Sequence, residues 1–183
     1  QWMGLAAVDL TTGAATEGCA CNLHTPTVVA VDGAPNRLVT SGAYGTETQL
    51  WDATAPVLAS VASHAPPSGS DGEVVTSSAA DRAWTAKGTE LVLSTMTPTA
   101  TAYPAPPTAR SVARSAGRGG VLAFDQVVAR QGTPTATHVL PAAPAPRSSA
   151  LDASGDRSYV GTSTGHLVVT DLAPVVAAVT PSR

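Results

Sequence analysis

Short apolar runs alternate with turn-forming residues along this chain, and the same pattern recurs in separate segments. In residues 28–54 and again in 149–174, an apolar run is followed by a polar turn, a second run ending in Ser, Thr or Gly, a hairpin, and a third run that closes on Asp. A third copy fits residues 84–106. Short runs bounded by Gly, Asn and Asp are typical of antiparallel strands. The pattern therefore predicts an all-β protein of repeated antiparallel units.

The repeats divide the chain into consecutive units of one region that spans residues 1–183. We expect units at 28–64, 73–106 and 147–183, with the end of another at 1–27. Residues 107–146 are either a degenerate unit or an insertion. The insertion is favoured, because the sequences ARSVARSAGRGG and TPTAT have a low propensity to form strands.

Aspartate recurs at one position of the repeat. Asp9, Asp52 and Asp171 each close an apolar strand. A carboxylate at a repeated strand end is expected to accept backbone hydrogen bonds, because recurrence at one position indicates architecture more than acid–base catalysis.

The unit resembles the WD repeat, in which four-stranded blades form a β-propeller. The strand, turn, strand and hairpin follow that family's order, and Trp51-Asp52 closes the third strand. The resemblance implies an all-β β-propeller with an incomplete set of blades from a longer chain. The Gly-His pair that precedes a blade in this family is absent from that place, since Gly165-His166 lies in a hairpin. The family's buried network of Asp, His, Ser/Thr and Trp is therefore not mapped onto the sequence.

The order of the units also resembles, more weakly, that of nucleolar WD-repeat factors that help assemble the large ribosomal subunit. The run Val-Gly-x-x-x-Gly-x-Leu-x-x-x-Asp-Leu at residues 160–172 is the best-matching part. The resemblance implies a role in ribosome biogenesis and a nucleolar or nuclear location.

Charge is sparse and unevenly placed. Charged residues make up 13% of the chain and the net charge is −3, so the whole chain has no electrostatic basis for binding nucleic acid. Residues 105–147, however, hold five arginines and one acid, Asp125. Arginine binds phosphate and carboxylate groups well, so we predict contact with RNA or an acidic partner here. The predicted contact residues are Arg110, Arg114, Arg118, Arg130 and Arg147, of which the first three would align on one face of a helix.

Two motifs suggest chemistry and are better explained by structure. Ser163 lies in a Gly-x-Ser-x-Gly sequence, but a strand follows it where a nucleophile elbow needs a helix, so we expect a hairpin. Cys19, Cys21 and His24 form a Cys-x-Cys-x-x-His sequence, whereas a zinc site normally needs four ligands at paired spacings. We therefore predict no catalytic residue, no metal and no cofactor.

The expected function is that of an intracellular, non-catalytic scaffold that binds other proteins of a larger assembly, with no membrane contact. No run of about 18 apolar residues exists that could span a bilayer. The alternative is an exported propeller that binds a ligand or cofactor and has enzymatic activity.

Overall fold

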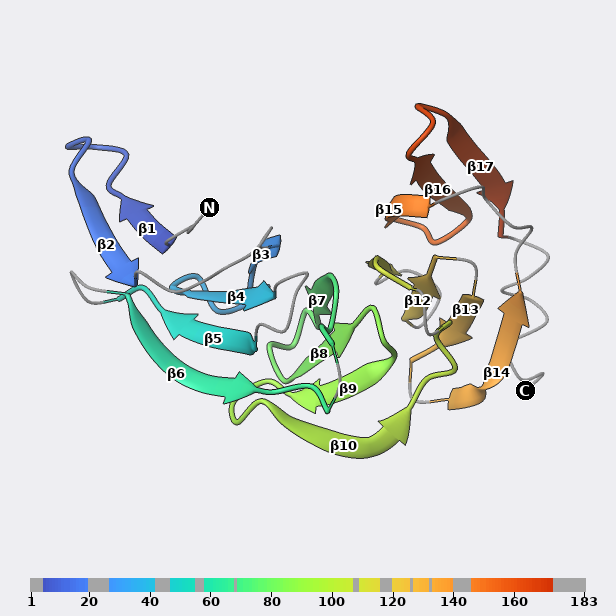
Figure 1. Cartoon of the computed structure of the whole chain (residues 1–183), viewed down its shortest axis with the longest axis horizontal. Helices are drawn as coiled ribbons and strands as arrows, with labels where there is room; N and C mark the ends of the chain where they lie inside the picture. Colours follow the sequence, from blue (N-terminus) through green and yellow to red (C-terminus); the bar gives the residue numbers. More distant parts are fainter. Residues whose placement is uncertain are drawn as a thin grey trace. The chain divides into compact units, whose positions relative to one another are not determined.

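The computed structural model describes residues 5–19, 27–41, 47–54, 58–67, 69–106, 109–115, 120–125, 127–131, 133–139 and 146–172. All regular elements in these ranges are β-strands, and consecutive strands pair antiparallel into separate sheets (Figure 1). No helix in these ranges is long and apolar enough to cross a membrane. The prediction of an all-β protein with blade-like antiparallel sheets is confirmed.

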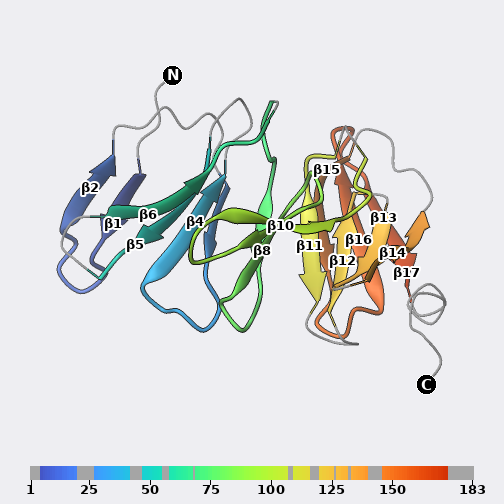
Figure 2. The ribbon, with the colours of Figure 1, turned by 90° about the horizontal axis from the view of Figure 1, so that it is seen from below.

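The chain divides into two compact units, and the first comprises Gln1–Ala83 and Leu91–Pro98. Its first sheet pairs β1 (Leu5–Val8) with β2 (Ala15–Cys19). The second sheet has four strands in sequence order: β3 (Thr27–Ala30), β4 (Arg37–Ser41), β5 (Thr48–Asp52) and β6 (Ala59–His64). Strands β4, β5 and β6 run side by side (Figure 2).

The third sheet also has four consecutive strands, and the boundary between the two units passes through it. The strands are β7 (Val74–Thr76), β8 (Arg82–Thr85), β9 (Thr89–Val92) and β10 (Thr97–Ala102). Trp84–Glu90 and the residues from Thr99 onward belong to the second unit.

The second unit also contains a four-stranded and a three-stranded sheet. The four-stranded sheet consists of β11 (Val112–Ser115), β12 (Val121–Phe124), β13 (Val127–Arg130) and β14 (Thr133–Val139). The three-stranded sheet consists of β15 (Pro146–Leu151), β16 (Arg157–Thr162) and β17 (Leu167–Asp171).

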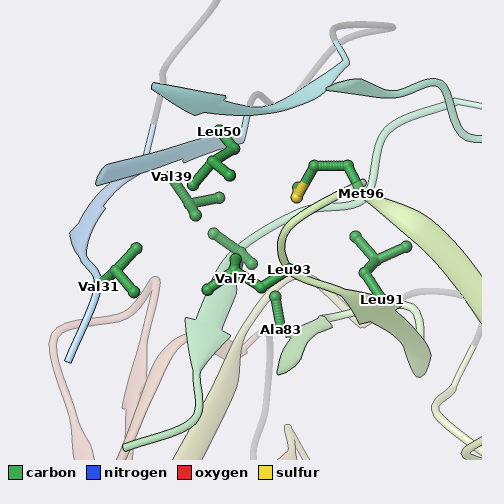
Figure 3. Close-up of a cluster of buried hydrophobic side chains, with 8 residues drawn as sticks. All are labelled: Val31, Val39, Leu50, Val74, Ala83, Leu91, Leu93 and Met96. Carbon is green, nitrogen blue, oxygen red and sulfur yellow. The ribbon is translucent and has the colours of Figure 1, made fainter. Parts of the chain in front are cut away.

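The core of the first unit is built from apolar side chains that lie on one face of their strands. Val39 in β4 and Leu50 in β5 are cross-strand partners, so both side chains point to the same face of the sheet, and both are fully buried. Figure 3 shows them converging with aliphatic side chains of the third sheet. The whole cluster consists of Val31, Val39, Leu50, Val74, Ala83, Leu91, Leu93 and Met96.

The preference for an insertion over residues 107–146 is wrong, because β11 to β14 form a complete four-stranded sheet there. All four side chains of β12 are buried, and Val121, Ala123 and Val128 pack with Leu172 in one apolar cluster. The sequence Thr-Pro-Thr-Ala-Thr belongs to β14, where the β-branched threonines suit a pleated strand. Strand β14 follows β13 after only two residues, which a tight hairpin accommodates.

Candidate interaction site

An arginine begins the second strand of three sheets. Arg37, Arg82 and Arg157 are the first residues of β4, β8 and β16. A shared backbone hydrogen bond shows that the three positions are equivalent: the residue after the third strand donates its N–H to the carbonyl of the residue before the arginine. The N···O distances are 2.7 Å for Ala53 to Asn36, 3.0 Å for Leu93 to Asp81, and 2.7 Å for Leu172 to Asp156.

A carboxylate accompanies each of these arginines. Arg37 lies opposite Asp52, and Arg157 lies opposite Asp171, in both cases as direct cross-strand partners. In the third sheet the carboxylate comes from the turn, where Asp81 Oδ2 lies 3.7 Å from Arg82 Nη1. The sheets therefore repeat a pair of opposite charges at the end where the first and second strands are joined. We name the three pairs the turn charge pairs.

Two of the three strand-end aspartates, Asp9 and Asp52, accept backbone hydrogen bonds as the sequence predicts. Asp52 Oδ1 accepts the N–H of Thr54 at 2.8 Å and also its hydroxyl. Asp9 Oδ1 accepts the N–H of Thr11 at 2.7 Å in the equivalent turn of the first sheet. The Thr54 hydroxyl, the Thr54 N–H and the charge of Arg37 lower the pKa of Asp52 below its ordinary value of 3.8.

The turn charge pairs were not recognised in the sequence, although a signal for them exists. The dipeptides Asn36-Arg37, Asp81-Arg82 and Asp156-Arg157 mark the start of the second strand in three sheets. The apolar strands dominate the repeat in the sequence, and a two-residue signal at the start of a strand is weak beside them.

The arginines predicted from the sequence have different surroundings. Arg110 is exposed, and its backbone N–H donates to Asp125 Oδ2 at 3.1 Å. The guanidinium of Arg114 lies over the ring of Trp84, 5.8 Å from the ring centroid, and the side chain is half-buried. The arginine charge thus makes a cation–π contact with a tryptophan of the same unit.

Arg114 and Arg130 lie on opposite faces of their sheet. Arg114 in β11 pairs with Leu122, whereas Arg130 in β13 pairs with Val121, the neighbour of Leu122 in β12. Successive side chains of a strand point to opposite faces, and cross-strand partners share a face. The alignment of Arg110, Arg114 and Arg118 on one face would require a helix, whereas Arg114 lies in strand β11, which pairs with the apolar strand β12.

Two of the predicted residues have no described side chain. Arg118 lies outside the described residues, and Arg147 is in β15, where only its backbone is described. Their contact with a partner stays a prediction, as it does for Arg110, Arg114 and Arg130.

A buried carboxylate in the second unit gathers polar groups from neighbouring strands. Glu90 in β9 is 8% exposed. Its Oε2 accepts the indole N–H of Trp84 at 2.9 Å and the hydroxyl of Tyr103 at 3.1 Å, and its Oε1 accepts the hydroxyl of Thr99 at 3.2 Å. The Tyr103 ring in turn lies 5.8 Å from the ring of Phe124 in β12. These contacts join β8, β9, β10 and β12 within the second unit.

A second set of buried polar groups lies in the first unit. Thr48 donates its hydroxyl to Asp71 Oδ2 at 2.6 Å, and Ser41 donates its hydroxyl to the carbonyl of Gly72 at 2.5 Å. His64 Nε2 lies 3.9 Å from Asp71 Oδ2, and both side chains are buried. These contacts tie the ends of β4, β5 and β6 to the segment that leads into β7.

The indole of Trp51 also binds a hydroxyl. Trp51 Nε1 in β5 donates to the hydroxyl of Thr40 in β4 at 2.8 Å, and both residues are buried. The second sheet thus supplies His, Ser, Thr and Trp side chains, and the segment before β7 supplies Asp71, to buried polar contacts that the sequence alone did not assign.

The sequence motifs with chemical potential occur in structural settings or outside the described residues. Ser163 is exposed in the hairpin between β16 and β17, as predicted. Cys19 ends β2 without a described side chain, and Cys21 and His24 lie outside the described residues. Within the described part of the chain, no three His, Cys, Asp or Glu residues are grouped as metal ligands.

No family model matches the chain, and no curated protein matches it. Solved structures do match, among them the crystal structure of a protein from Lactobacillus plantarum, a structural genomics target. That match has a TM-score of 0.54 and 15% sequence identity, and it covers 91% of this chain and 61% of the other. This chain therefore spans about three-fifths of that protein's length. The likeness shows the fold, which is an incomplete set of blades of a β-propeller-like protein.

Proposed function

We propose that this protein is a non-catalytic scaffold that binds other proteins within a larger assembly. The turn charge pairs carry this proposal, because three sheets each place an Arg and an Asp together at equivalent turns. Hydrogen-bonded sheets hold such turns in fixed positions, and fixed charges of both signs suit the recognition of a complementary protein surface.

The proposed subfamily is the WD-repeat type. The Trp51–Thr40 hydrogen bond and the buried His64, Asp71, Ser41 and Thr48 supply the residue types of that family's polar network. This support is limited to the second sheet, since the third sheet builds its buried network around Glu90.

The arginine-rich segment is proposed as a contact with RNA, in keeping with a role in ribosome biogenesis at a nucleolar or nuclear location. Arg110 supports the proposal most strongly, because its side chain is exposed while its backbone is fixed by Asp125. An exposed arginine on a fixed backbone can bind phosphate at a small cost in conformational entropy.

Quantitative affinity capture of the full-length protein from its own cells tests both contacts, performed with and without nuclease and read by mass spectrometry. The double variant Arg157→Asp with Asp171→Arg keeps the cross-strand pair and the net charge but reverses its direction. We expect it to lose protein partners whether or not nuclease is present. We expect Arg110→Glu to lose only the nuclease-sensitive ones.

Ribosomal proteins and assembly factors among the nuclease-sensitive partners are the expected result. Recovery of the protein alone with a bound small molecule or metal contradicts the scaffold and supports the exported ligand-binding propeller. Capture of the same partners by wild type and by the charge-reversed variant contradicts the role of the turn charge pairs.

A further inference from the structure

The hairpin between β8 and β9 brings a lysine to the segment that leads into β11. Lys87 lies in this hairpin and is half-buried, and its Nζ donates to the carbonyl of Ala109 at 2.8 Å. Arg110 follows Ala109 in the chain, and its side chain is exposed. Consecutive Cα atoms are about 3.8 Å apart, so the ammonium group is bound one residue away from the backbone that carries the guanidinium. Two cationic residues from separate elements of the second unit are therefore neighbours.

The backbone that carries the two cations is fixed by hydrogen bonds. Asp125 is buried, and its carboxylate accepts the N–H groups of Arg110 and Ser111 at 3.1 and 3.3 Å. In the hairpin, Gly88 accepts the N–H of Tyr103 at 2.8 Å. A ligand that binds both cations would therefore order mainly their side chains, which lowers the entropic cost of binding.

Most acidic side chains of the second unit lie away from this pair. Glu90 is 8% exposed, and its carboxylate binds Trp84 and other donors within the unit. Asp125 offsets one of the two positive charges of Lys87 and Arg110, so the local sum stays positive. The remaining acids flank the turn before β16 and are Asp152, Asp156 and Asp171.

That acidic turn lies at the far end of β11 from Arg110. Ser115 is the last residue of β11, and it donates its hydroxyl to the carbonyl of Ala153 in the turn at 3.0 Å. Arg110 comes two residues before the strand begins at Val112. Four residues of strand span roughly 13 Å. This is more than the Debye length of about 10 Å at 0.1 M salt, so the carboxylates of the turn offset the charge of the cationic pair only weakly.

We propose that Lys87 and Arg110 together bind one phosphate group of RNA. This inference rests on the RNA contact proposed above for Arg110, and it adds a residue from outside the arginine-rich segment. An ammonium and a guanidinium group side by side can donate to different oxygens of one phosphate. A carboxylate has two oxygens in one plane, which a guanidinium alone can satisfy, so the pair of cations favours a phosphate.

Fluorescence anisotropy of the full-length protein with a labelled single-stranded RNA of about ten nucleotides tests the proposal. Lys87→Met and Arg110→Gln should each weaken binding by about fivefold at about 0.1 M salt. The double variant should bind about as weakly as either single variant, because both cations serve one phosphate. Lys87→Arg keeps the positive charge and should bind within about twofold of the wild type. Ala153→Glu changes the net charge as much as Lys87→Met does, but at the far end of β11, and should bind like the wild type.

Wild-type affinity of Lys87→Met overturns the inference, and weak binding by Arg110→Gln would then leave the proposed RNA contact in place. Losses that multiply in the double variant assign the cations to separate phosphates and also overturn it. Absence of RNA binding by the wild type contradicts the proposed RNA contact and this inference with it. Displacement of the RNA by inorganic phosphate or by a poly-glutamate peptide, at constant ionic strength, assigns the pair to a free phosphate or an acidic protein and overturns it as well.

A second measurement needs no variant and applies even if Lys87→Met fails to fold. In the wild type, saturating RNA should protect Lys87 from an amine-reactive reagent. Mass spectrometry of the peptide that contains Lys87 measures this as slower acylation. An acylation rate that RNA leaves unchanged overturns the inference.

Discussion

Glu90 accepts the indole N–H of Trp84 at 2.9 Å while both side chains are buried between strands of the second unit. The same carboxylate binds Tyr103 and Thr99, so one acidic side chain satisfies three donors. A buried carboxylate is costly without such partners, and its donors are costly to leave unpaired.

Glu90→Ala should therefore destabilise the protein strongly. Removal of the carboxylate leaves the Trp84 and Tyr103 donors buried without an acceptor, for a loss of about 3 kcal/mol in the free energy of unfolding. Glu90→Gln keeps one acceptor oxygen and should cost about 1 kcal/mol. Urea denaturation followed by tryptophan fluorescence measures both, and equal losses for the two variants would contradict the acceptor role of Glu90.

Arg114 and Arg110 should differ in what their removal does. Arg114→Ala removes the guanidinium from the Trp84 ring and should cost about 1 kcal/mol of stability. Arg110→Ala removes an exposed side chain while leaving its backbone bond to Asp125, so the change should stay within about 0.5 kcal/mol. Paired urea denaturation curves provide the comparison. A larger loss for Arg110→Ala would contradict the placement of these two side chains.

Gly88 occupies a position that a side chain cannot enter. Its φ is +78°, and a Cβ there would lie 2.2 Å from the carbonyl oxygen of Tyr103. Gly88→Ala should cost about 3 kcal/mol or more, because it adds a backbone clash to the strain of a left-handed conformation. Gly165 has a φ of +81° with no atom within 4 Å of the same Cβ position, so Gly165→Ala should cost about 1 kcal/mol. Thermal unfolding of the two variants separates clash from strain, and equal shifts in Tm would contradict the close approach.

Asp52 should make stability depend on pH in the acid range. Its pKa is lower in the folded protein than the ordinary value of 3.8, so the carboxylate stabilises the fold above that value. The contribution declines as the pH falls through the lowered pKa. Asp52→Asn keeps an acceptor for Thr54 but cannot ionise, so wild type should be the more stable at pH 7 and lose that advantage below pH 3.8. Urea denaturation across this range provides the measurement, and a constant difference between the two proteins would contradict the assignment.

The sequence predicts the sheets best where the apolar runs are clear and the turns between them carry Gly, Asn or Asp. The second sheet is an example, because short apolar runs surround Val39 and Leu50, and Gly33 and Asn36 mark the turn before β4. The sequence predicts the sheet less well in residues 107–146, because Arg114 and the threonines of β14 interrupt the apolar pattern there. Arg114 is accommodated by the Trp84 ring, a tertiary contact that no local pattern encodes.

The candidate site was less predictable than the fold. Clustering of arginines in sequence implied one surface, but the register of β11, β12 and β13 separates Arg114 from Arg130. Polar networks such as Trp84–Glu90–Tyr103 depend on residues that come together only when the strands pair.

The sheet of β11 to β14 is the feature on which the blade architecture depends most, because it replaces the favoured insertion. Ala123 and Val128 are cross-strand partners, and the hydrogen bond from Gln131 to Gly120 places them at a non-hydrogen-bonded position of the ladder. Their α-protons should therefore give a strong NOE in the full-length protein. Observation of that NOE supports a four-stranded blade at 112–139, and its absence in the folded protein would contradict the architecture.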